Sequence, residues 1–300
     1  MDAPRSHIPV MAGEVVELLG AAPGRQLIDL TAGAGGHSMA FLEAAGAGAS
    51  VIACDRDAEA LSLAEVRLAP FAERVQLEHG DSVSCLARLR KRGVRADAIL
   101  LDLGVSSMQL DESVRGFSLR TDGPLDMRMD RSQARTAADL LNRASEEELT
   151  NILRDFGDEP RAAKLAQSFV ERRERRPWRS TGDLRTHVET VLRRRGGKIH
   201  PATRVFQALR MAVNAELDLL REALPAALDL LAPGGRLVVI SFHSGEDRIV
   251  KETFRAFADT QRAELLSRKP LRPTLTEQRR NTRSRSARVR GVAARPRDAS

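Results

Sequence analysis

Residues 26–38 of the chain read QLIDLTAGAGGHS, an apolar run that leads directly into a glycine-rich turn. A short strand followed by such a turn is a common binding place for a nucleotide, because backbone N–H groups of the turn and the next helix face the ligand. A dinucleotide-binding turn has the pattern G-x-G-x-x-G, or alanine at the third position. Here Gly33 and Gly35 fill the first two positions and Ser38 stands at the third, so the strict pattern is not met.

Asp29 lies in the strand just before the glycines and discriminates between classes of nucleotide. A pyrophosphate at this helix N-terminus would bring anionic oxygens close to the Asp29 carboxylate. S-adenosylmethionine carries a sulfonium and an ammonium and has no phosphate, so Asp29 would face its amino-acid portion, directly or through water. Gly33, Gly35 and Gly36 would let the backbone approach this ligand. The alternative is a tight strand-to-helix turn without a ligand.

A second acidic residue, Asp55, ends the next apolar run about 20 residues beyond the glycines, where a carboxylate accepts hydrogen bonds from both ribose hydroxyls. This position serves NAD and S-adenosylmethionine alike. Capping of the following helix is the alternative role for Asp55.

Five apolar runs predict β-strands, and segments with helical spacing separate the first three. The runs are residues 26–30, 50–55, 74–78, 97–103 and 236–242. In AEALSLAEVRLAP, Leu61, Ala64 and Leu68 fall on one helical face behind Asp57, a candidate N-cap. Strands that alternate with helices predict an α/β fold with a parallel, doubly wound sheet.

About 130 residues separate the fourth run from the fifth, whereas one crossover needs only a dozen or more, so we expect an inserted domain. Its helices have recognisable ends: a capping-box pattern at Ser145–Glu148, Pro160 in a first turn, and Gly196 and Gly197 after a third apolar stripe. A long helix then returns to the sheet, with an apolar face of Phe206, Leu209, Val213, Leu217 and Leu220. The predicted limits are 1–107 and 206–270 for the α/β domain, 108–205 for the helical insertion and 271–300 for a basic, flexible tail.

The net charge of +7 is unevenly placed. Arg262–Ser300 holds 12 Lys and Arg against 3 Asp and Glu, and Arg161–Lys198 holds 12 against 4. Two separated basic segments suit a long polyanion better than a small anionic metabolite. Solvated helix faces and a disordered end are the alternative.

No run reaches the ~20 apolar residues that span a bilayer, and the first residues lack the pattern of a secretory signal. We therefore expect a cytoplasmic protein without membrane contact. Cys54 lies in an apolar run and Cys85 in a predicted helix, and their spacing does not match a zinc site, so a packing role is favoured. No metal site is expected.

Polar residues also follow the later strands. Asp102 ends the fourth run, in LDLGVSS, and the fifth run delivers Ser241, His243 and Ser244. In an open α/β sheet the carboxyl ends of parallel strands face the ligand crevice, so these residues are expected near cofactor and acceptor. A capped turn is the alternative, for His243 above all.

Long motifs in a fixed order connect the chain to a known family. Over nearly its whole length it resembles the bacterial small-subunit ribosomal RNA cytosine-N4 methyltransferases. The motifs are HIPVM from His7, GAGGHS from Gly33, ACDRD from Ala53, DLGVSSMQLD from Asp102, RGFSLRTDGPLDMRMD from Arg115, RVFQALRMAVNAEL from Arg204, LAPGGRLVVISFHSGEDRIVK from Leu231 and NTRSRSARVR from Asn281. The resemblance implies a class I S-adenosylmethionine-dependent methyltransferase fold with a helical insertion.

The same resemblance implies an activity and a set of site residues. The substrate would be a decoding-region cytosine of 16S rRNA, free or within the small ribosomal subunit; the oligomeric state is open, with a homodimer as one alternative. The implied cofactor contacts are Gly35, Gly36, His37, Asp55, Asp102 and Gln109. A further contact is implied at Ser82, where the family usually has an aromatic residue, so we expect a backbone contact there rather than stacking on the adenine.

The exocyclic amine of cytosine is a poor nucleophile because its lone pair is delocalised into the ring. An enzyme must orient this amine and accept its hydrogen bonds. We expect Asp102, or Asp126 of PLDMRMD, to orient the amine, and His243 to accept a proton. A local ion pair of Arg128 with Asp126 is the alternative for that loop.

Other functions stay open from the residues alone. Phe117 or Phe242 would stack on an extruded base, with packing in a core as the alternative. A nicotinamide-dependent dehydrogenase shares the predicted fold but does not explain Asp29 or Ser38. A noncatalytic RNA-binding module explains the charge but leaves the polar residues at the strand ends unused.

Overall fold

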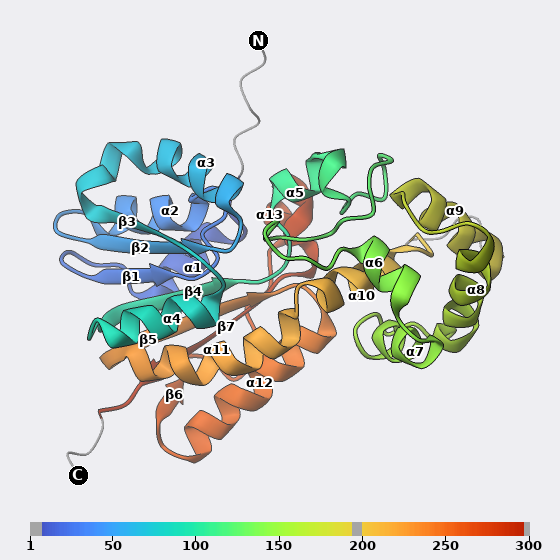
Figure 1. Cartoon of the computed structure of the whole chain (residues 1–300). Helices are drawn as coiled ribbons and strands as arrows, with labels where there is room; N and C mark the ends of the chain where they lie inside the picture. Colours follow the sequence, from blue (N-terminus) through green and yellow to red (C-terminus); the bar gives the residue numbers. More distant parts are fainter. Residues whose placement is uncertain (1–7, 194–199, 297–300) are drawn as a thin grey trace. The chain divides into compact units, whose positions relative to one another are not determined.

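The computed structural model describes residues 8–193 and 200–296, and within them the chain divides into two compact units. Residues 8–104 and 217–296 form the first unit, and residues 105–193 and 200–216 form the second (Figure 1). The insertion expected at residues 108–205 is wider in the structure, because the helix that follows it packs into the same apolar core.

The first unit is built on a seven-stranded sheet with the strand order β3-β2-β1-β4-β5-β7-β6. The neighbours among β1 to β5 pair in parallel, and β7 runs antiparallel to both β5 and β6. The strands are β1 (Gln26–Asp29), β2 (Ser50–Asp55), β3 (Val75–His79), β4 (Ala96–Asp102), β5 (Leu231–Ser241), β6 (Ala263–Leu265) and β7 (Arg288–Ala294). All five expected strands are present, and β5 begins earlier than expected.

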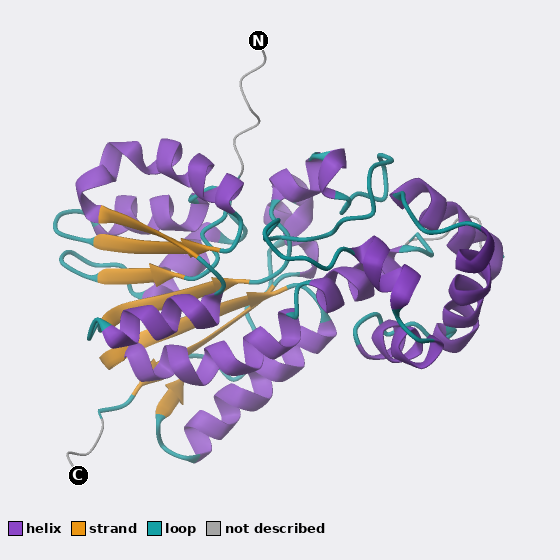
Figure 2. Ribbon diagram, in the orientation of Figure 1, coloured by secondary structure: helices purple, strands orange, loops and turns teal. Residues whose placement is uncertain are grey.

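Helices cover both faces of this sheet, with α2 and α3 on one side and α4, α11 and α12 on the other (Figure 2). The helices of the unit are α1 (Ala12–Leu19), α2 (Gly36–Ala45), α3 (Ala58–Leu68), α4 (Ser82–Lys91), α11 (Glu216–Leu230), α12 (Ser244–Asp259) and α13 (Leu275–Arg280), with the 3-10 turns η1 (Ala69–Arg74) and η3 (Thr282–Ser286). Asp57 caps α3 as predicted, since its Oδ1 accepts the N–H of Glu59 at 3.1 Å. Cys54 and Cys85 are both buried.

Residues 271–296 are folded, so the prediction of a flexible tail is wrong for them. α13 and η3 lead into β7, which lies between β5 and β6. Val289 is fully buried, while its neighbours Arg288 and Arg290 reach Asp247 of α12 at 3.6 and 2.8 Å. This segment therefore forms a strand in which buried and arginine residues alternate, although its arginine-rich composition is also typical of a disordered segment. Residues 297–300 of the predicted tail lie outside the described residues.

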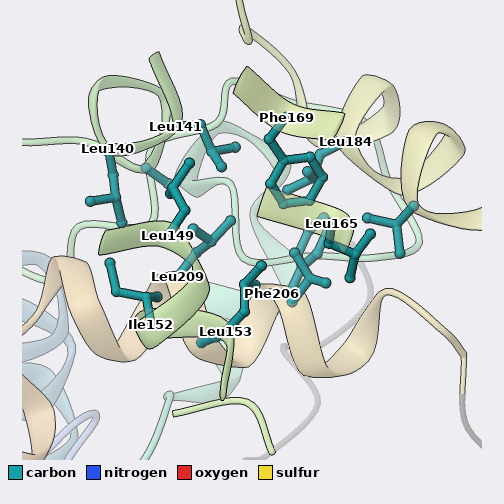
Figure 3. Packing of buried hydrophobic residues seen from close by; sticks show 14 of the residues in the cluster. Leu140, Leu141, Leu149, Ile152, Leu153, Leu165, Phe169, Leu184, Phe206 and Leu209 are labelled. Atoms are coloured by element: carbon teal, nitrogen blue, oxygen red, sulfur yellow. The ribbon is translucent and has the colours of Figure 1, made fainter. Parts of the chain in front are cut away.

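The second unit is a helical domain around one apolar core. Its elements are α5 (Ser107–Asp111), η2 (Ser113–Arg115), α6 (Ala137–Arg143), α7 (Glu146–Asp155), α8 (Ala162–Arg175), α9 (Thr181–Leu192) and α10 (Thr203–Val213). Figure 3 shows Leu149 of α7, Leu165 and Phe169 of α8 and Leu209 of α10 converging in this core from three helices. Ser145 caps α7 by accepting the N–H of Glu148 at 3.0 Å, as predicted. Gly196 and Gly197, the predicted end of the third helix, lie outside the described residues.

The expected long helix over residues 206–220 is wrong, because the structure divides it into α10 and α11. Ala215 adopts a left-handed conformation with φ of 49° and interrupts the helical path. Just before it, the Asn214 side chain donates to the carbonyl of Met127 at 2.7 Å and accepts the N–H of Met129 at 2.8 Å. The break thus lets an asparagine hold a neighbouring loop, a reason that apolar spacing does not reveal.

Within the described residues, no helix combines the length and apolar character needed to cross a bilayer.

Candidate active site

Three carboxylates end neighbouring parallel strands of the first unit. Asp29 closes β1, Asp55 closes β2 and Asp102 closes β4. β1 lies between β2 and β4, so the chain leaves β1 toward one side of the sheet and later returns on the other. Ligands of open α/β sheets bind at this kind of switch point, outside the carboxyl ends of the strands.

The glycine-rich turn between β1 and α2 needs glycine for two separate reasons. Gly35 has φ of 77°, and a Cβ there would lie 3.1 Å from Cγ of Leu68, so both conformation and space favour glycine. Gly33 has φ of 52°, but a Cβ at Gly33 would meet nothing within 4 Å. The turn therefore packs against α3 at Gly35 and leaves open space beside Gly33.

Asp29 is buried, and its carboxylate holds the turn through two hydrogen bonds. Its Oδ2 accepts the hydroxyl of Ser38 at 2.7 Å, and its Oδ1 accepts the N–H of Thr31 at 3.3 Å. Burial raises the pKa of Asp29, while the hydrogen bond from Ser38 opposes this shift. Ser38, the residue that departs from the dinucleotide pattern, is thus the partner of Asp29. The role of Asp29 as a cofactor contact stays a prediction.

Asp55 joins the turn to the start of α3. Its Oδ2 accepts the N–H of Gly33 at 2.7 Å and its Oδ1 accepts the N–H of Asp57 at 2.9 Å. Desolvation raises the pKa of Asp55 to about 6, and these two hydrogen bonds limit the rise. Because a carboxylate oxygen has two lone pairs, each oxygen can accept one further donor such as a ribose hydroxyl. Asp57, rather than Asp55, is the N-cap of α3.

His37 and Asp102 form the least satisfied polar pair at this edge. Nε2 of His37 lies 3.5 Å from Oδ2 of Asp102, and the imidazole is only 6% exposed. Within the described chain, neither ring nitrogen of His37 has a hydrogen-bond partner, nor does the buried Oδ1 of Asp102. The Asp102 backbone is fixed by its N–H, which donates to Oγ1 of Thr31 at 2.6 Å. Buried polar atoms normally have partners, so these atoms indicate a place where a ligand supplies them.

Ser82 is the first residue of α4, directly after the helix cap. Asp81 provides that cap by accepting the N–H of Ser84 at 2.9 Å. β3 ends at His79 and pairs in parallel with β2, so Ser82 follows the same edge of the sheet as Asp55. The contact of Ser82 with the cofactor stays a prediction.

His243 is held as a helix cap. Its Nδ1 accepts the N–H of Glu246 at 3.3 Å, and its Nε2 lies 2.8 Å from Oε1 of Glu246 but is buried without a hydrogen-bond partner in the described chain. Glu246 in turn accepts the N–H of Phe242 at 2.8 Å. Both ring nitrogens therefore face Glu246, and this geometry favours the capping role over that of a proton acceptor.

Two of the predicted site residues, Gln109 and Asp126, belong to the second unit. Gln109 is buried and its Oε1 accepts the N–H of Ser106 at 3.0 Å in the capping box of α5. Asp126 forms a bidentate pair with Arg128, with distances of 2.7 and 2.8 Å. This pairing outweighs desolvation and lowers the pKa of Asp126. The contribution of both residues to a site with Asp102 stays a prediction.

The loop that carries Asp126 is anchored by Arg115, which begins one of the quoted motifs but was given no role there. Arg115 is buried, and its guanidinium donates to the carbonyls of Arg128 and Met129 at 3.2 and 2.9 Å. Asn214 holds the same loop from α10. The Asp126 carboxylate is therefore presented from a fixed backbone.

A family model described as the MraW methylase family matches residues 4–295 of the chain. The chain belongs to the MraW methylase family. Three curated relatives, each named ribosomal RNA small subunit methyltransferase H, are similar over nearly their whole length. The relative from Heliobacterium modesticaldum is 45% identical and the match covers 95% of this chain and 97% of that protein. The relative from Syntrophotalea carbinolica is 46% identical over the same shares, and that from Solidesulfovibrio magneticus is 45% identical over 100% of this chain and 98% of its own.

Membership of the MraW methylase family agrees with the sheet. The strand order with an antiparallel β7 between β5 and β6 is that of a class I methyltransferase, as expected from the sequence. The residues present fit S-adenosylmethionine, because Gly33 leaves open space, the carboxylate of Asp55 keeps acceptor capacity, and His37 and Asp102 carry partnerless buried atoms in the described chain. No group of three metal-ligating side chains occurs in the part of the chain that the structure describes.

The two aromatic candidates of this MraW methylase differ in burial. Phe117 is buried in the core of the second unit, which favours the packing role. Phe242 is partly buried against the core of the first unit, directly after β5. A stacking role at Phe242 stays a prediction.

Proposed function

We propose that this protein transfers a methyl group from S-adenosylmethionine to the exocyclic N4 amine of a decoding-region cytosine in 16S rRNA. The observation that carries the proposal is the partnerless pair His37 and Asp102 beside the glycine-rich turn, in a chain of the MraW methylase family. The names of the relatives support ribosomal RNA of the small subunit as the substrate. The acceptor is the RNA within the small ribosomal subunit, in the bacterial cytoplasm.

The first unit binds and orients the donor. S-adenosylmethionine supplies a methyl group on a positively charged sulfonium. The backbone at Gly33, Gly35 and Gly36 approaches the donor, and ionised Asp55 accepts its ribose hydroxyls. Nε2 of His37 lies 3.5 Å from the Asp102 carboxylate. The donor or the acceptor supplies hydrogen-bond partners for the buried atoms of both residues that have none in the described chain.

Asp102 orients the acceptor amine. Its Oδ1 has no partner in the described chain, so it is available to accept a hydrogen bond from the N4 amine. That hydrogen bond draws the lone pair out of conjugation and directs it toward the methyl group. As the N–C bond forms, the S–C bond of the sulfonium breaks and S-adenosylhomocysteine leaves; the Asp102 carboxylate receives the proton that the amine loses. We assign His243 to capping, because both its ring nitrogens face Glu246.

Asp126 is the second candidate for holding the amine. Its pair with Arg128 keeps the carboxylate ionised, and each oxygen has acceptor capacity left. The ion pair with Arg128 also fixes the direction in which the Asp126 carboxylate points.

Transfer of radiolabelled methyl from S-adenosylmethionine tests the proposal. The acceptors are small ribosomal subunits and stripped 16S rRNA from a strain that lacks this protein, followed by nucleoside analysis. We expect label in N4-methylcytidine, with subunits as the better substrate. Label in another nucleoside, or none while the protein binds the donor, would overturn the proposed substrate.

Three variants separate the roles of the site residues. Asp102→Ala is expected to lower kcat by at least about a hundredfold, Asp126→Ala to lower kcat less, and His243→Ala to act mainly on stability. Donor affinity is measured separately for each by calorimetry. Unchanged turnover in both aspartate variants would contradict the assignment.

A further inference from the structure

The segment from Leu271 to Arg290 concentrates positive charge that the fold leaves exposed. It holds seven arginines and one acidic residue, Glu277. Two of the arginines, Arg288 and Arg290, are engaged by Asp247 of α12. The other five are exposed and define what we call the C-terminal arginine surface: Arg272, Arg279, Arg280, Arg283 and Arg285.

Most of this charge has no partner among the residues that the structure describes. Among the described residues, Arg272, Arg279, Arg280 and Arg285 form no ion pair. The carboxylate of Glu277 is turned to the N-terminal segment instead, where its Oε1 accepts the N–H of Met11 at 3.1 Å. An uncompensated row of guanidiniums creates a positive potential that attracts a polyanion.

The strand topology places this surface at the carboxyl edge of the parallel strands. β7 is antiparallel to β5, and its first residue, Arg288, pairs with Ser241, the last residue of β5. The residues before β7 therefore lie beyond the end of β5, at the edge where Asp29, Asp55 and Asp102 end their strands. Figure 1 shows α13 at this end of the sheet.

The N-terminal segment lies between this surface and the glycine-rich turn and contacts both. Nδ2 of Asn281, between α13 and η3, donates to the carbonyl of Ile8 at 3.1 Å. The next residue, Pro9, packs on the turn, since a Cβ built at Gly36 would lie 3.3 Å from Cβ of Pro9. The segment that carries the arginines is thus connected to the proposed donor site through residues 8 and 9.

The backbone under the arginines is well fixed. Thr274 caps α13 by accepting the N–H of Glu277 at 3.2 Å, and Asn281 caps η3 by accepting the N–H of Arg283 at 3.3 Å. Ser284 is fully buried and donates to the carbonyl of Asn281 at 2.7 Å. A fixed array of guanidiniums loses little backbone entropy on binding, unlike a flexible basic tail.

We propose that the C-terminal arginine surface binds the phosphate backbone of the RNA that flanks the target cytosine. The inference rests on the proposed function, and adds to it the surface that positions the RNA. Guanidiniums recognise phosphate through paired, charge-assisted hydrogen bonds. Such contacts fix the register of the RNA without reading its sequence.

Two double variants and one matched control test this surface. The variants are Arg279→Gln/Arg280→Gln and Arg272→Gln/Arg285→Gln. The control is Arg90→Gln/Lys91→Gln, which removes the same charge from two exposed residues in the last turn of α4. That turn precedes β4 and so lies at the amino edge of the sheet, away from the surface.

Methyl transfer to small subunits and binding of 16S rRNA are measured across a salt series, with donor affinity determined separately. For each double variant we expect a KM for RNA that is raised about tenfold and a plot of log K against log salt that is shallower by about 2. kcat at saturating RNA and donor affinity should match the wild-type values, and the control should behave as wild type.

Other outcomes would overturn the inference in distinct ways. Wild-type RNA affinity and salt slope in both double variants would exclude the surface. An equal loss in the control would show that net charge alone matters, and a loss of donor affinity would assign the arginines to the fold. RNA bound through the arginines without formation of N4-methylcytidine would leave the surface standing and overturn the proposed function instead.

Discussion

Two arginine-rich regions of similar composition differ in how the fold uses their arginines. By composition, the basic segment Arg161–Lys198 suits a polyanion, and its residues 194–198 lie outside the described residues. In its described part, Arg172 stacks on Trp178 at 3.8 Å and pairs with Asp183 at 3.3 Å. Arg173 donates to the carbonyls of Leu141 and Ala144 at the end of α6. In the C-terminal arginine surface, by contrast, the guanidiniums are exposed. A count of arginines therefore does not measure the positive charge available to a partner.

The difference comes from what the fold provides near each region. The helical unit offers an aromatic face, a carboxylate and two terminal carbonyls within reach of α8, and a guanidinium satisfies all three kinds of partner. Around α13 and η3 the only acidic residue of the segment is turned to Met11. We therefore expect substitution of the engaged Arg172 to change stability, and substitutions in the C-terminal arginine surface to change RNA binding.

The largest effect on stability is expected at Arg115, the buried arginine of the Asp126 loop. Its side chain is 1% exposed, and Arg115→Ala would leave the carbonyls of Arg128 and Met129 without their donor. We expect a loss of about 3 kcal/mol or more in the free energy of unfolding. Urea unfolding followed by fluorescence measures it, because Trp178 is the sole tryptophan and lies in the same unit. A loss below about 1 kcal/mol would contradict this anchoring role.

Arg172→Ala is expected to destabilise the helical unit by about 2 kcal/mol, since it removes both the stacking on Trp178 and the pair with Asp183. Arg175→Ala on the same helix is the control, because Arg175 is exposed and has no partner in the described chain. The same unfolding assay applies. If both variants lose equal stability, helix charge rather than the stacking is the cause.

The carboxylates of the first unit also differ in whether their partner lies inside the protein or on the ligand. Asp29 is engaged by Ser38, whereas ionised Asp55 is proposed to accept the ribose hydroxyls. Because the pKa of Asp55 is raised to about 6, we expect donor affinity to fall by up to about tenfold per pH unit as the pH drops below 6. Calorimetric titration from pH 5 to 8 measures this, and Asp55→Asn should abolish that part of the pH dependence.

The same raised pKa has a consequence for the protein without donor. A carboxyl whose pKa is higher in the folded state than in the unfolded state binds its proton more tightly when the protein is folded. The stability that Asp55 contributes is therefore greatest at a pH below the pKa of the unfolded state, and it is lost as the pH rises toward 6. A pH series of unfolding free energies for wild type and Asp55→Asn isolates this contribution. A steeper rise of stability with pH in the wild type would contradict the direction.

The smallest effect is expected at Arg176. Its side chain is 71% exposed and shares Asp183 with Arg172. Arg176→Ala should change the free energy of unfolding by less than about 0.5 kcal/mol, as is usual for an exposed pair. The double variant of Arg279 and Arg280 should be equally neutral in the same assay, although it weakens RNA binding. A large stability loss in either would remove the distinction between the two regions.

Much of the fold could be predicted because it depends on local patterns. The strands β1 to β5 are short apolar runs, and the long gap before β5 could only be an insertion. β7 could not be predicted, because arginines alternate with Val289 in it. Arg288 and Arg290 are accommodated in a strand by their ion pairs with Asp247, which lies far away in sequence. The division between α10 and α11 likewise depends on the contact of Asn214 with a loop far away in sequence.

The candidate site shows the same limit. Sequence position indicated Asp29, Asp55 and Asp102 as strand ends, and the structure places them at one edge. The partners could not be derived, since the hydrogen bond from Ser38 to Asp29 and the bond from Asp102 to Thr31 depend on the path of the turn. Local capping by His243 was weighed from its position after β5, and only the geometry favours it over proton transfer.

The strand order also constrains the time course of folding during synthesis. The helical unit is contiguous, so all of its core residues are translated before β5. β6 is translated before β7, its pairing partner in the described sheet. β6 therefore cannot pair until β7 has been made. Because domains generally fold as units, the nascent protein should carry a formed helical domain next to an unfinished sheet with an open β4 edge. That exposed edge is where a chaperone would be needed.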